Sequence, residues 1–207
     1  MRAALDALVR AEPRFARVEA AAGPLPWRVR PAGFPGLLQA VVAQQISSAA
    51  AAAIWARLRA LPDGQAPDGL LLLPDDALRC AGLSRPKVAH ARALAEAFVS
   101  GRLSAGGLEA MDDADAMAAI TAVRGLGPWT AEVYLLFALG RQDVFPAADI
   151  AVAGAAADLL GLPARPGPHA LRDLAEAWRP SRALAARLLW HHWRFLTGRP
   201  SMDDGPG

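Results

Sequence analysis

The chain has 207 residues, of which 54% are apolar, and a formal net charge of +2. That length suits one compact body or two small lobes, and the apolar fraction is large enough to form a core. No apolar run approaches the roughly 20 residues of a membrane span, so we expect no membrane partner. The N-terminus has charges spread through it and does not fit a secretory signal. The single cysteine, Cys80, cannot form an internal disulfide or hold a multi-cysteine zinc or iron–sulfur site, which favours a reducing cytoplasm.

The basic residues are almost all arginine: 21 of the 22, with Lys87 the only lysine. The planar guanidinium fork suits phosphate contacts, although a biased composition also raises the arginine content. The balance of charge therefore permits a nucleic-acid partner without requiring one.

Alanine and leucine dominate and alternating β-branched residues are scarce, so the chain is expected to be almost entirely helical. A first helix is predicted from Ala3 to Ala21, followed by a proline-broken loop over 23–36. An apolar segment from Leu37 to Ala43 ends at the interruption "QQIS", after which Ser47 can cap a helix that reaches Arg59.

Residues 61–69, "LPDGQAPDG", are predicted to form a second loop. A short helix then starts at Asp75 or Asp76 and ends at Gly82, and Ser84 can cap the next, which reaches Val99. The remaining helices are expected from Asp112 or Asp113 to Val123, from Trp129 to Leu139, up to Leu160, from Pro168 to Trp178 and from Ser181 to Phe195. Residues 201–207 are predicted to be a disordered tail.

The stretch 123–139, "VRGLGPWTAEVYLLFAL", joins two predicted helices through two glycines and a proline. Gly125 and Gly127 permit positive φ and leave backbone N–H groups unshielded. The helix that follows begins with free N–H groups and its positive dipole end, and such a terminus binds phosphate readily. An ordinary helix–helix connection uses the same residue types, so the spacing alone leaves both interpretations open.

This stretch, followed by "DVFPAADIAV", resembles the helix-hairpin-helix–Gly/Pro–Asp superfamily of DNA glycosylases, and within it the alkylpurine branch of 3-methyladenine DNA glycosylase II type. Similar segments are "AVVAQQISSAAAAAIWARL", "LRCAGLSRPKVAHARALAEAF" and "WRPSRALAARLLWHHW", so the likeness spans most of 34–193 in the right order. It implies an all-α, two-lobed fold without the N-terminal β domain of larger relatives. The middle lobe would be 34–142, with the hairpin at around 112–139, and the second lobe 1–33 plus 143–200.

The resemblance assigns catalysis to Asp149, which opens the apolar segment "IAVAGAAADLLG". By itself an aspartate there is a favoured helix N-cap. Cleavage of a glycosidic bond builds positive charge on the sugar, which a carboxylate stabilises, and the same group can orient or deprotonate the attacking water. Asp143 is the alternative carboxylate, whereas Asp112, Asp113 and Asp115 are interpreted as caps.

The resemblance also implies an aromatic substrate pocket, because ring faces attract the positive charge of an alkylated base. Bifunctional members carry a Schiff-base lysine at the hairpin position that is Trp129 here, and Lys87 lies in another segment, so hydrolysis without lyase activity is expected. The implied pocket residues are Trp129, Trp190, Val133 and Ile150. The last two occupy positions where the family has aromatic residues, with Tyr134 beside Val133. Trp190 shares a helix with Arg187 and Arg194, and Trp178 and Trp193 are interpreted as core.

For DNA binding the resemblance implies Gln45 as the wedge that replaces a flipped nucleotide, together with Gly125, Gly127 and Thr130. Gln44 and Gln45 can equally satisfy backbone groups at a helix break. The family holds a monovalent cation, Na⁺ or K⁺, on hairpin carbonyls, which here belong to Thr121, Val123 and Leu126. His191 and His192 are adjacent on a helix and point apart, so they are assigned to the surface or to DNA phosphate rather than to a metal.

The leading hypothesis is a monomeric, nucleoid-associated base-excision repair enzyme in the cytoplasm, with no required cofactor. It would flip alkylated purines, of the 3-methyladenine or 7-methylguanine type, from double-stranded DNA and hydrolyse the N-glycosidic bond. Two alternatives remain: a non-catalytic helix-hairpin-helix DNA-binding module, and a glycosylase for another lesion.

Overall fold

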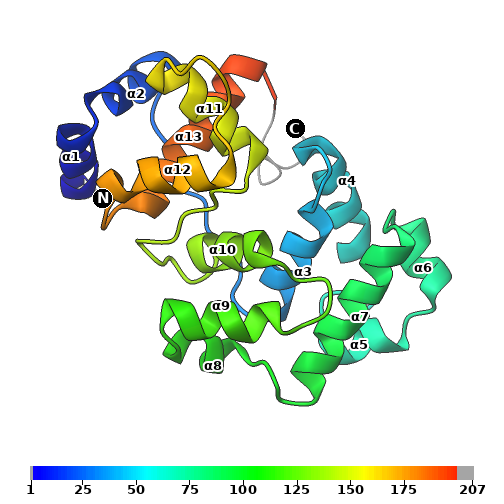
Figure 1. Cartoon of the computed structure of the whole chain (residues 1–207). Helices are drawn as coiled ribbons and strands as arrows, with labels where there is room; N and C mark the ends of the chain where they lie inside the picture. Colours follow the sequence, from blue (N-terminus) through cyan, green and yellow to red (C-terminus); the bar gives the residue numbers. More distant parts are fainter. Residues whose placement is uncertain (1, 200–207) are drawn as a thin grey trace. The chain divides into compact units, whose positions relative to one another are not determined.

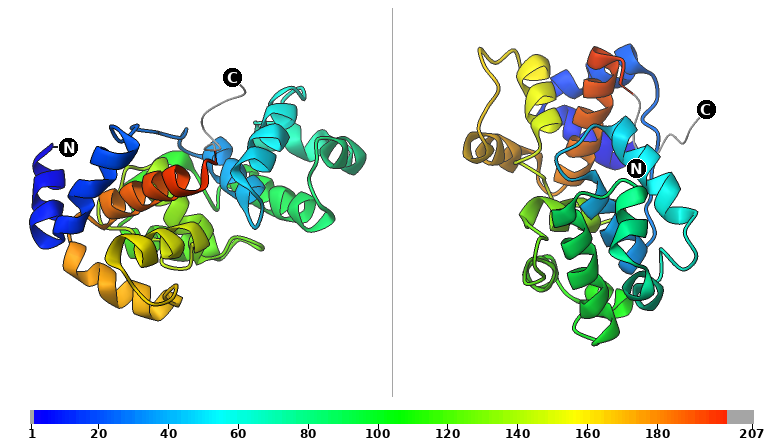
Figure 2. Two further views of the ribbon diagram at one scale, coloured as in Figure 1. Left: turned by 90° about the horizontal axis from the view of Figure 1, so that it is seen from above. Right: turned by 90° about the vertical axis from the view of Figure 1, so that its right-hand side faces the viewer.

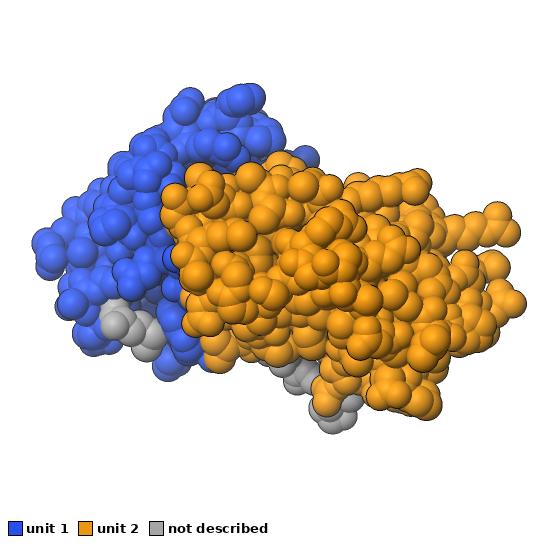
Figure 3. Space-filling view, turned by 90° about the horizontal axis from the view of Figure 1, so that it is seen from below, with its two compact units in different colours: residues 1–28, 140–199 blue, residues 29–139, 200–207 orange. Residues whose placement is uncertain are grey.

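The computed structural model describes residues 2–199, and over that range the chain consists of helices and their connections, with no strand (Figure 1). The predicted all-α class is confirmed. No helix in this range is long and apolar enough to cross a membrane. The predicted tail, 201–207, lies outside the described residues. Two compact units are formed: unit 1 comprises the residues up to 28 together with 140–199, and unit 2 comprises 29–139 (Figure 3).

Unit 1 is built around its last helix, α13 (Arg182–Thr197), which packs against α11 (Ile150–Leu160) and α2 (Ala16–Ala22) (Figures 1 and 2). Its other elements are α1 (Arg2–Ala11), the 3₁₀ turn η1 (Pro13–Phe15), α12 (Pro168–Ala175) and the 3₁₀ turn η2 (Glu176–Trp178). Trp178 is 3% exposed and makes edge-on ring contacts with Phe15 and Phe145, at centroid distances of 5.2 and 5.5 Å. The interpretation of Trp178 as a core residue is confirmed.

The central helix of unit 2 is α3 (Phe34–Ala43), which is apolar and buried over almost its whole length (Figure 1). It packs against α4 (Ser48–Arg59), α7 (Arg85–Val99) and α10 (Pro128–Phe137). The remaining helices are α5 (Pro67–Leu72), α6 (Asp75–Cys80), α8 (Ala105–Ala110) and α9 (Asp113–Thr121). Because α3 contacts both α7 and α10, the segment that follows α3 is held close to the hairpin formed by α9 and α10.

Several helix starts follow the expected capping chemistry. The Ser47 hydroxyl accepts a hydrogen bond from the N–H of Ala50 at 3.3 Å, and the Asp112 carboxylate accepts from the N–H of Asp115 at 2.8 Å. Each cap satisfies one of the N–H groups that a helix start leaves without an intrahelical partner. Ser84 occupies the N-cap position of α7, but its side chain makes no capping hydrogen bond.

The prediction of one continuous first helix from Ala3 to Ala21 is wrong, because the helix is interrupted near its middle. The chain forms α1, breaks at Glu12, and resumes through η1 into α2. Pro13 lacks an N–H and its ring clashes with the preceding turn, so the helix cannot continue through it. Glu12 is extended, and its carboxylate accepts from the backbone and guanidinium of Arg14, which lowers the pKa of Glu12.

Other predicted elements also need correction. Pro67 to Gly69, expected in the loop 61–69, already belong to α5, because proline is well suited to the first helical turn. The helix α8 was missed since Gly106 and Gly107 disfavour helix; the Ser104 hydroxyl caps it and Leu108 is buried beneath it. The two hairpin helices are also shifted: α9 ends at Thr121 instead of Val123, and α10 covers 128–137 instead of 129–139.

Tyr134 ties α10 to the start of α3. The side chain is 1% exposed, and its hydroxyl accepts a hydrogen bond from the N–H of Gly33 at 2.8 Å, immediately before α3 begins. Burial raises the pKa of Tyr134. This phenol is therefore committed to the interior of unit 2, where it supplies an acceptor to a buried backbone donor.

We predict that Tyr134→Phe lowers the free energy of unfolding by about 1–3 kcal/mol, because the N–H of Gly33 would remain buried without its acceptor. Urea denaturation followed by circular dichroism measures the change. A Tyr134→Phe protein as stable as wild type would contradict this assignment.

Candidate active site

Asp149 occupies the N-cap of α11 in unit 1. Its Oδ1 accepts hydrogen bonds from the N–H groups of Ala151 and Val152 at 2.8 and 2.9 Å. The positive end of the helix dipole lies beside the carboxylate, an arrangement that favours a negative charge. The capping role and the predicted catalytic role are compatible, because the same bonds that start the helix also fix the orientation of the carboxylate.

The structure brings Trp190 to the same oxygen. The indole Nε1 of Trp190, on α13, donates to Oδ1 of Asp149 at 3.2 Å, and both side chains are half-buried. One carboxylate oxygen thus receives three donors from two helices. An anion and an electron-rich ring held together in this way offer two attractive partners to a bound cation. Ile150, the next residue, is 67% exposed.

Arg187 and Trp27 extend this part of unit 1, and the sequence pattern did not single out Trp27. Arg187 is only 5% exposed; its guanidinium donates to the carbonyl of Arg28 at 2.7 Å and lies 4.3 Å from the centroid of the Trp27 ring. Arg187 lies one turn before Trp190 on α13, while the Trp27 ring is 52% exposed. A tryptophan within the proline-rich segment 23–36 was the signal that the sequence offered.

Asp143, the alternative carboxylate, is engaged in an ion-pair network. Arg182 donates to its Oδ1 at 2.8 Å, and Arg179 pairs with its other oxygen and with Glu176. The hydrogen bond from Arg179 lowers the pKa of Glu176. Two guanidinium groups therefore neutralise Asp143 within unit 1, which makes it a structural rather than a reactive carboxylate.

The assignment of His191 and His192 to the surface or to phosphate is wrong. They are 8% and 7% exposed, because α13 is the central helix of unit 1 and is covered on most sides. His191 Nε2 lies 3.0 Å from the carbonyl of Gly23, and His192 Nε2 lies 2.7 Å from the carboxylate of Asp158. Within residues 2–199, no group of histidine, cysteine and acidic side chains is arranged to hold a metal ion.

In unit 2, α9 and α10 pack together and are joined by the turn 122–127, as the hairpin prediction requires. Gly125 has φ +85°, and a Cβ added there would lie 2.0 Å from the His90 ring of α7. Glycine is therefore needed at 125 both for backbone conformation and for space. Gly127 differs from expectation: its φ is −92°, at the N-cap of α10, and a Cβ would meet nothing within 4 Å.

The hairpin side chains have different exposures. Trp129, in the first turn of α10, is half-buried, whereas Thr130 is 1% and Val133 2% exposed. Val133 therefore offers almost no surface to a ligand. Lys87 is also in unit 2, where its Nζ donates to the carbonyl of Val42 at 2.7 Å and desolvation lowers its pKa.

Gln44 and Gln45 form the turn between α3 and α4. Gln45 is exposed and has φ +56°, a left-handed conformation that is uncommon for a residue with a side chain. Gln44 is half-buried, and its amide donates to the carbonyl of Gly125 and to the hydroxyl of Thr130. The turn therefore presents one glutamine outward and directs the other to the hairpin.

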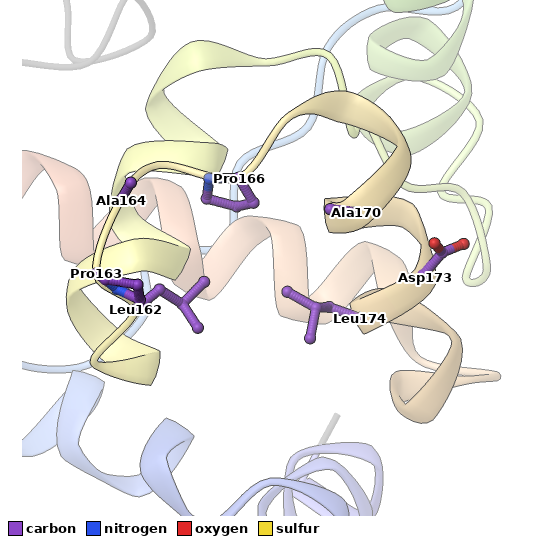
Figure 4. A pocket seen from close by; sticks show the side chains of 7 residues that line it. All are labelled: Leu162, Pro163, Ala164, Pro166, Ala170, Asp173 and Leu174. Atoms are coloured by element: carbon purple, nitrogen blue, oxygen red, sulfur yellow. The ribbon is translucent and has the colours of Figure 1, made fainter.

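An apolar hollow of about 540 Å³ lies elsewhere in unit 1, between the connection that follows α11 and the helix α12 (Figure 4). Leu162 and Leu174 face each other across it, and Asp173 is the charged residue in its lining. None of the predicted site residues contributes to the hollow, and its wide opening does not fit a pocket that surrounds a base.

Comparisons with known proteins identify the family to which the chain belongs. Residues 38–180 match the family described as HhH-GPD superfamily base excision DNA repair protein. DNA-3-methyladenine glycosylase 1 of Schizosaccharomyces pombe is 32% identical over 158 residues, which cover 74% of this chain and 69% of that protein. The chain therefore belongs to the HhH-GPD superfamily of base excision DNA repair proteins.

Two solved structures share the fold over nearly the whole chain. The S. pombe 3-methyladenine DNA glycosylase in complex with abasic DNA has a TM-score of 0.84 at 27% identity, covering 92% of this chain and 95% of that one. A DNA-3-methyladenine glycosidase from Bacillus halodurans has a TM-score of 0.77 at 31% identity, covering 97% and 94%. Both are similar in sequence as well as in fold.

We predict that Gly125→Ala destabilises the hairpin turn. The positive φ alone costs roughly 1–2 kcal/mol for a residue with a Cβ, and the His90 ring must also move. Gly127→Ala is the matched control, since that position is neither left-handed nor crowded. Thermal unfolding of the two variants tests this; equal losses of stability, or a larger loss for Gly127→Ala, would contradict it.

Proposed function

We propose that the chain is a monomeric DNA glycosylase that removes alkylated purines, of the 3-methyladenine and 7-methylguanine type, from double-stranded DNA. It hydrolyses the N-glycosidic bond and leaves an abasic site. The observation that carries the proposal is the Asp149 carboxylate, fixed at the start of α11 and bonded by the indole of Trp190. The names of the S. pombe and B. halodurans relatives support the choice of substrate.

Asp149 supplies the negative charge that the reaction needs. As the bond to the base breaks, positive charge develops on C1′ and the ring oxygen of the sugar, and a preorganised anion stabilises that charge. Because three hydrogen bonds already hold the carboxylate, little reorganisation is needed when the charge appears. The same group orients or deprotonates the water that attacks C1′.

Trp190 of unit 1 binds the extruded base in this proposal, and Trp129 of unit 2 is the other aromatic residue that the family resemblance suggests for base binding. An alkylated purine carries positive charge, and each ring face that it meets contributes roughly 0.5–2 kcal/mol. The charged base is a good leaving group, so no general acid is required. The hydrogen bond from Trp190 to Asp149 fixes the angle of its ring. Ile150, which is exposed, is a further pocket residue suggested by the family resemblance, whereas Val133, also suggested by it, is too buried to contact the base.

The hairpin holds the DNA backbone. The positive dipole end of α10, together with Gly125, Gly127 and Thr130, receives a phosphate, and Gln45 enters the stack when the nucleotide is flipped. The cation implied by the resemblance would be held by the carbonyls of Thr121, Val123 and Leu126. Neutral carbonyl oxygens are the donors that suit Na⁺ or K⁺, and the ion would add positive charge near the phosphate.

We predict that the wild-type protein releases methylated purines from alkylated duplex DNA and that Asp149→Asn lowers the single-turnover rate by about 100-fold or more. Asparagine caps a helix as well as aspartate does, so the fold is retained while the charge is lost. Asp143→Asn is the comparison variant and should keep its activity. A wild type that releases no methylated purine would sink the proposed function, and an active Asp149→Asn would sink the role of Asp149.

We further predict that the enzyme has no lyase activity. Trp129 stands where a Schiff-base lysine would be needed, and the Nζ of Lys87 is bonded to the carbonyl of Val42. Borohydride reduction during turnover should therefore trap no protein–DNA crosslink, and the product should be an intact strand with an abasic site. A crosslink that disappears in Lys87→Arg would overturn the hydrolytic mechanism.

A further inference from the structure

The turn that carries Gln45 is linked to the hairpin by the side chain of its neighbour. Nε2 of Gln44 donates to the carbonyl of Gly125 at 3.0 Å and to Oγ1 of Thr130 at 2.9 Å. A primary amide has two N–H groups, and both are used here on acceptors of the hairpin. Gln44 therefore joins the end of α3 to the turn before α10 and to the first turn of α10 itself.

One face of helix α7 contacts both the end of α3 and the hairpin turn, the two segments that Gln44 joins. Lys87 donates to the carbonyl of Val42 at 2.7 Å, just before Gln44, and His90 packs directly under Gly125. Residues three apart on a helix lie on the same side, so one turn of α7 contacts the end of α3 and the hairpin turn together. Burial, and to a lesser extent the charge of Arg124, lowers the pKa of His90 and favours its neutral form.

The cluster explains how Gln45 can remain in a left-handed conformation. Gln45 has φ +56° and an exposed side chain. Unlike a glycine, a glutamine has a Cβ that strains the backbone in this conformation. Such a conformation persists where the surrounding structure over-determines it. The two hydrogen bonds of Gln44 fix the residue immediately before Gln45, while the Ser47 cap fixes the start of α4 two residues later.

We propose that Gln44 is a positioning residue for nucleotide flipping. Its amide holds the turn of Gln45 in register with the hairpin, so that the wedge enters the DNA stack at a fixed distance from the phosphate that the hairpin binds. The proposal rests on the proposed glycosylase function and on Gln45 as the wedge. Gln44 itself touches neither the base nor the sugar in this account; it acts through Gln45.

The test compares single-turnover excision of 7-methylguanine from two duplexes, one with the lesion paired to cytosine and one with it opposite an abasic site. A base without a partner is easier to extrude, so the second duplex depends less on the wedge. Gln44→Ala should lower the rate on the paired duplex by about 10- to 100-fold, the range expected when a group is misplaced by about 1 Å. The rate on the unpaired lesion and the affinity for undamaged duplex should stay near wild type.

A double-mutant cycle separates positioning from an independent contact. If Gln44 acts through Gln45, the Gln44→Ala/Gln45→Ala protein should be no slower than Gln45→Ala alone. Thr130→Val removes one acceptor of the Gln44 amide while keeping the shape of the side chain. It should lower the rate on the paired duplex less than Gln44→Ala does, and it replaces Gln44→Ala in the test if that variant does not fold. Gln142→Ala, which removes an exposed glutamine side chain in unit 1, is the matched control.

The possible results are distinct. If wild type is active and Gln45→Ala is impaired, but Gln44→Ala and Thr130→Val are not, the positioning role of Gln44 is overturned and the proposed function stands. Equal losses of Gln44→Ala on both duplexes, or losses that multiply with Gln45→Ala, also overturn it, because they indicate a structural or separate role. A fully active Gln45→Ala protein would contradict both the role of Gln45 as the wedge and the positioning role of Gln44. An inactive wild type overturns the proposed function, and the inference falls with it.

Discussion

The hydrogen bonds to Oδ1 of Asp149 are the interaction on which the proposed chemistry depends. Two come from the first turn of α11 and one from the indole of Trp190 on α13. A helix cap is among the most common uses of aspartate, and here the same geometry keeps a carboxylate oriented. The packing of α11 against α13 brings the third donor within reach, so the site relies on the core of unit 1.

Unit 2 is constrained by sterics. The hairpin turn needs a glycine at 125, because the backbone is left-handed there and His90 fills the space below it. The apolar helix α3 organises this unit: it contacts α7 and α10, and it ends at the turn of Gln44 and Gln45. The residues that would grip DNA are thus built on rigid helices, while the outward-facing Gln45 sits on a short turn fixed from both sides.

Much of this could be predicted from local chemistry. The helices follow from the high content of alanine and leucine, and the caps Ser47 and Asp112 follow from the capping preference of these residue types. The hairpin between α9 and α10 follows from the glycines that interrupt the helical pattern. The break at Pro13 was also predictable in principle, since proline rarely continues a helix, but the predicted first helix ran through it.

Features set by tertiary contacts could not be predicted. His191 and His192 appear polar in sequence, yet α13 is central and buries both of them. Tyr134 could have faced a ligand, and only the proximity of Gly33 shows that its hydroxyl serves the backbone. The two glutamines at 44 and 45 are identical in chemistry, so only the turn geometry separates the one bonded to the hairpin from the one that faces outward.

The central claim is that Asp149 stabilises positive charge at C1′ of the sugar. The direct measurement is the affinity for duplex DNA that contains a pyrrolidine abasic analogue, protonated where the charge develops, relative to the neutral tetrahydrofuran analogue. Wild type should prefer the cationic analogue by at least about 100-fold, the lower end for transition-state analogues, and Asp149→Asn should lose most of that preference. An Asp149→Asn protein with the same preference as wild type would contradict the account.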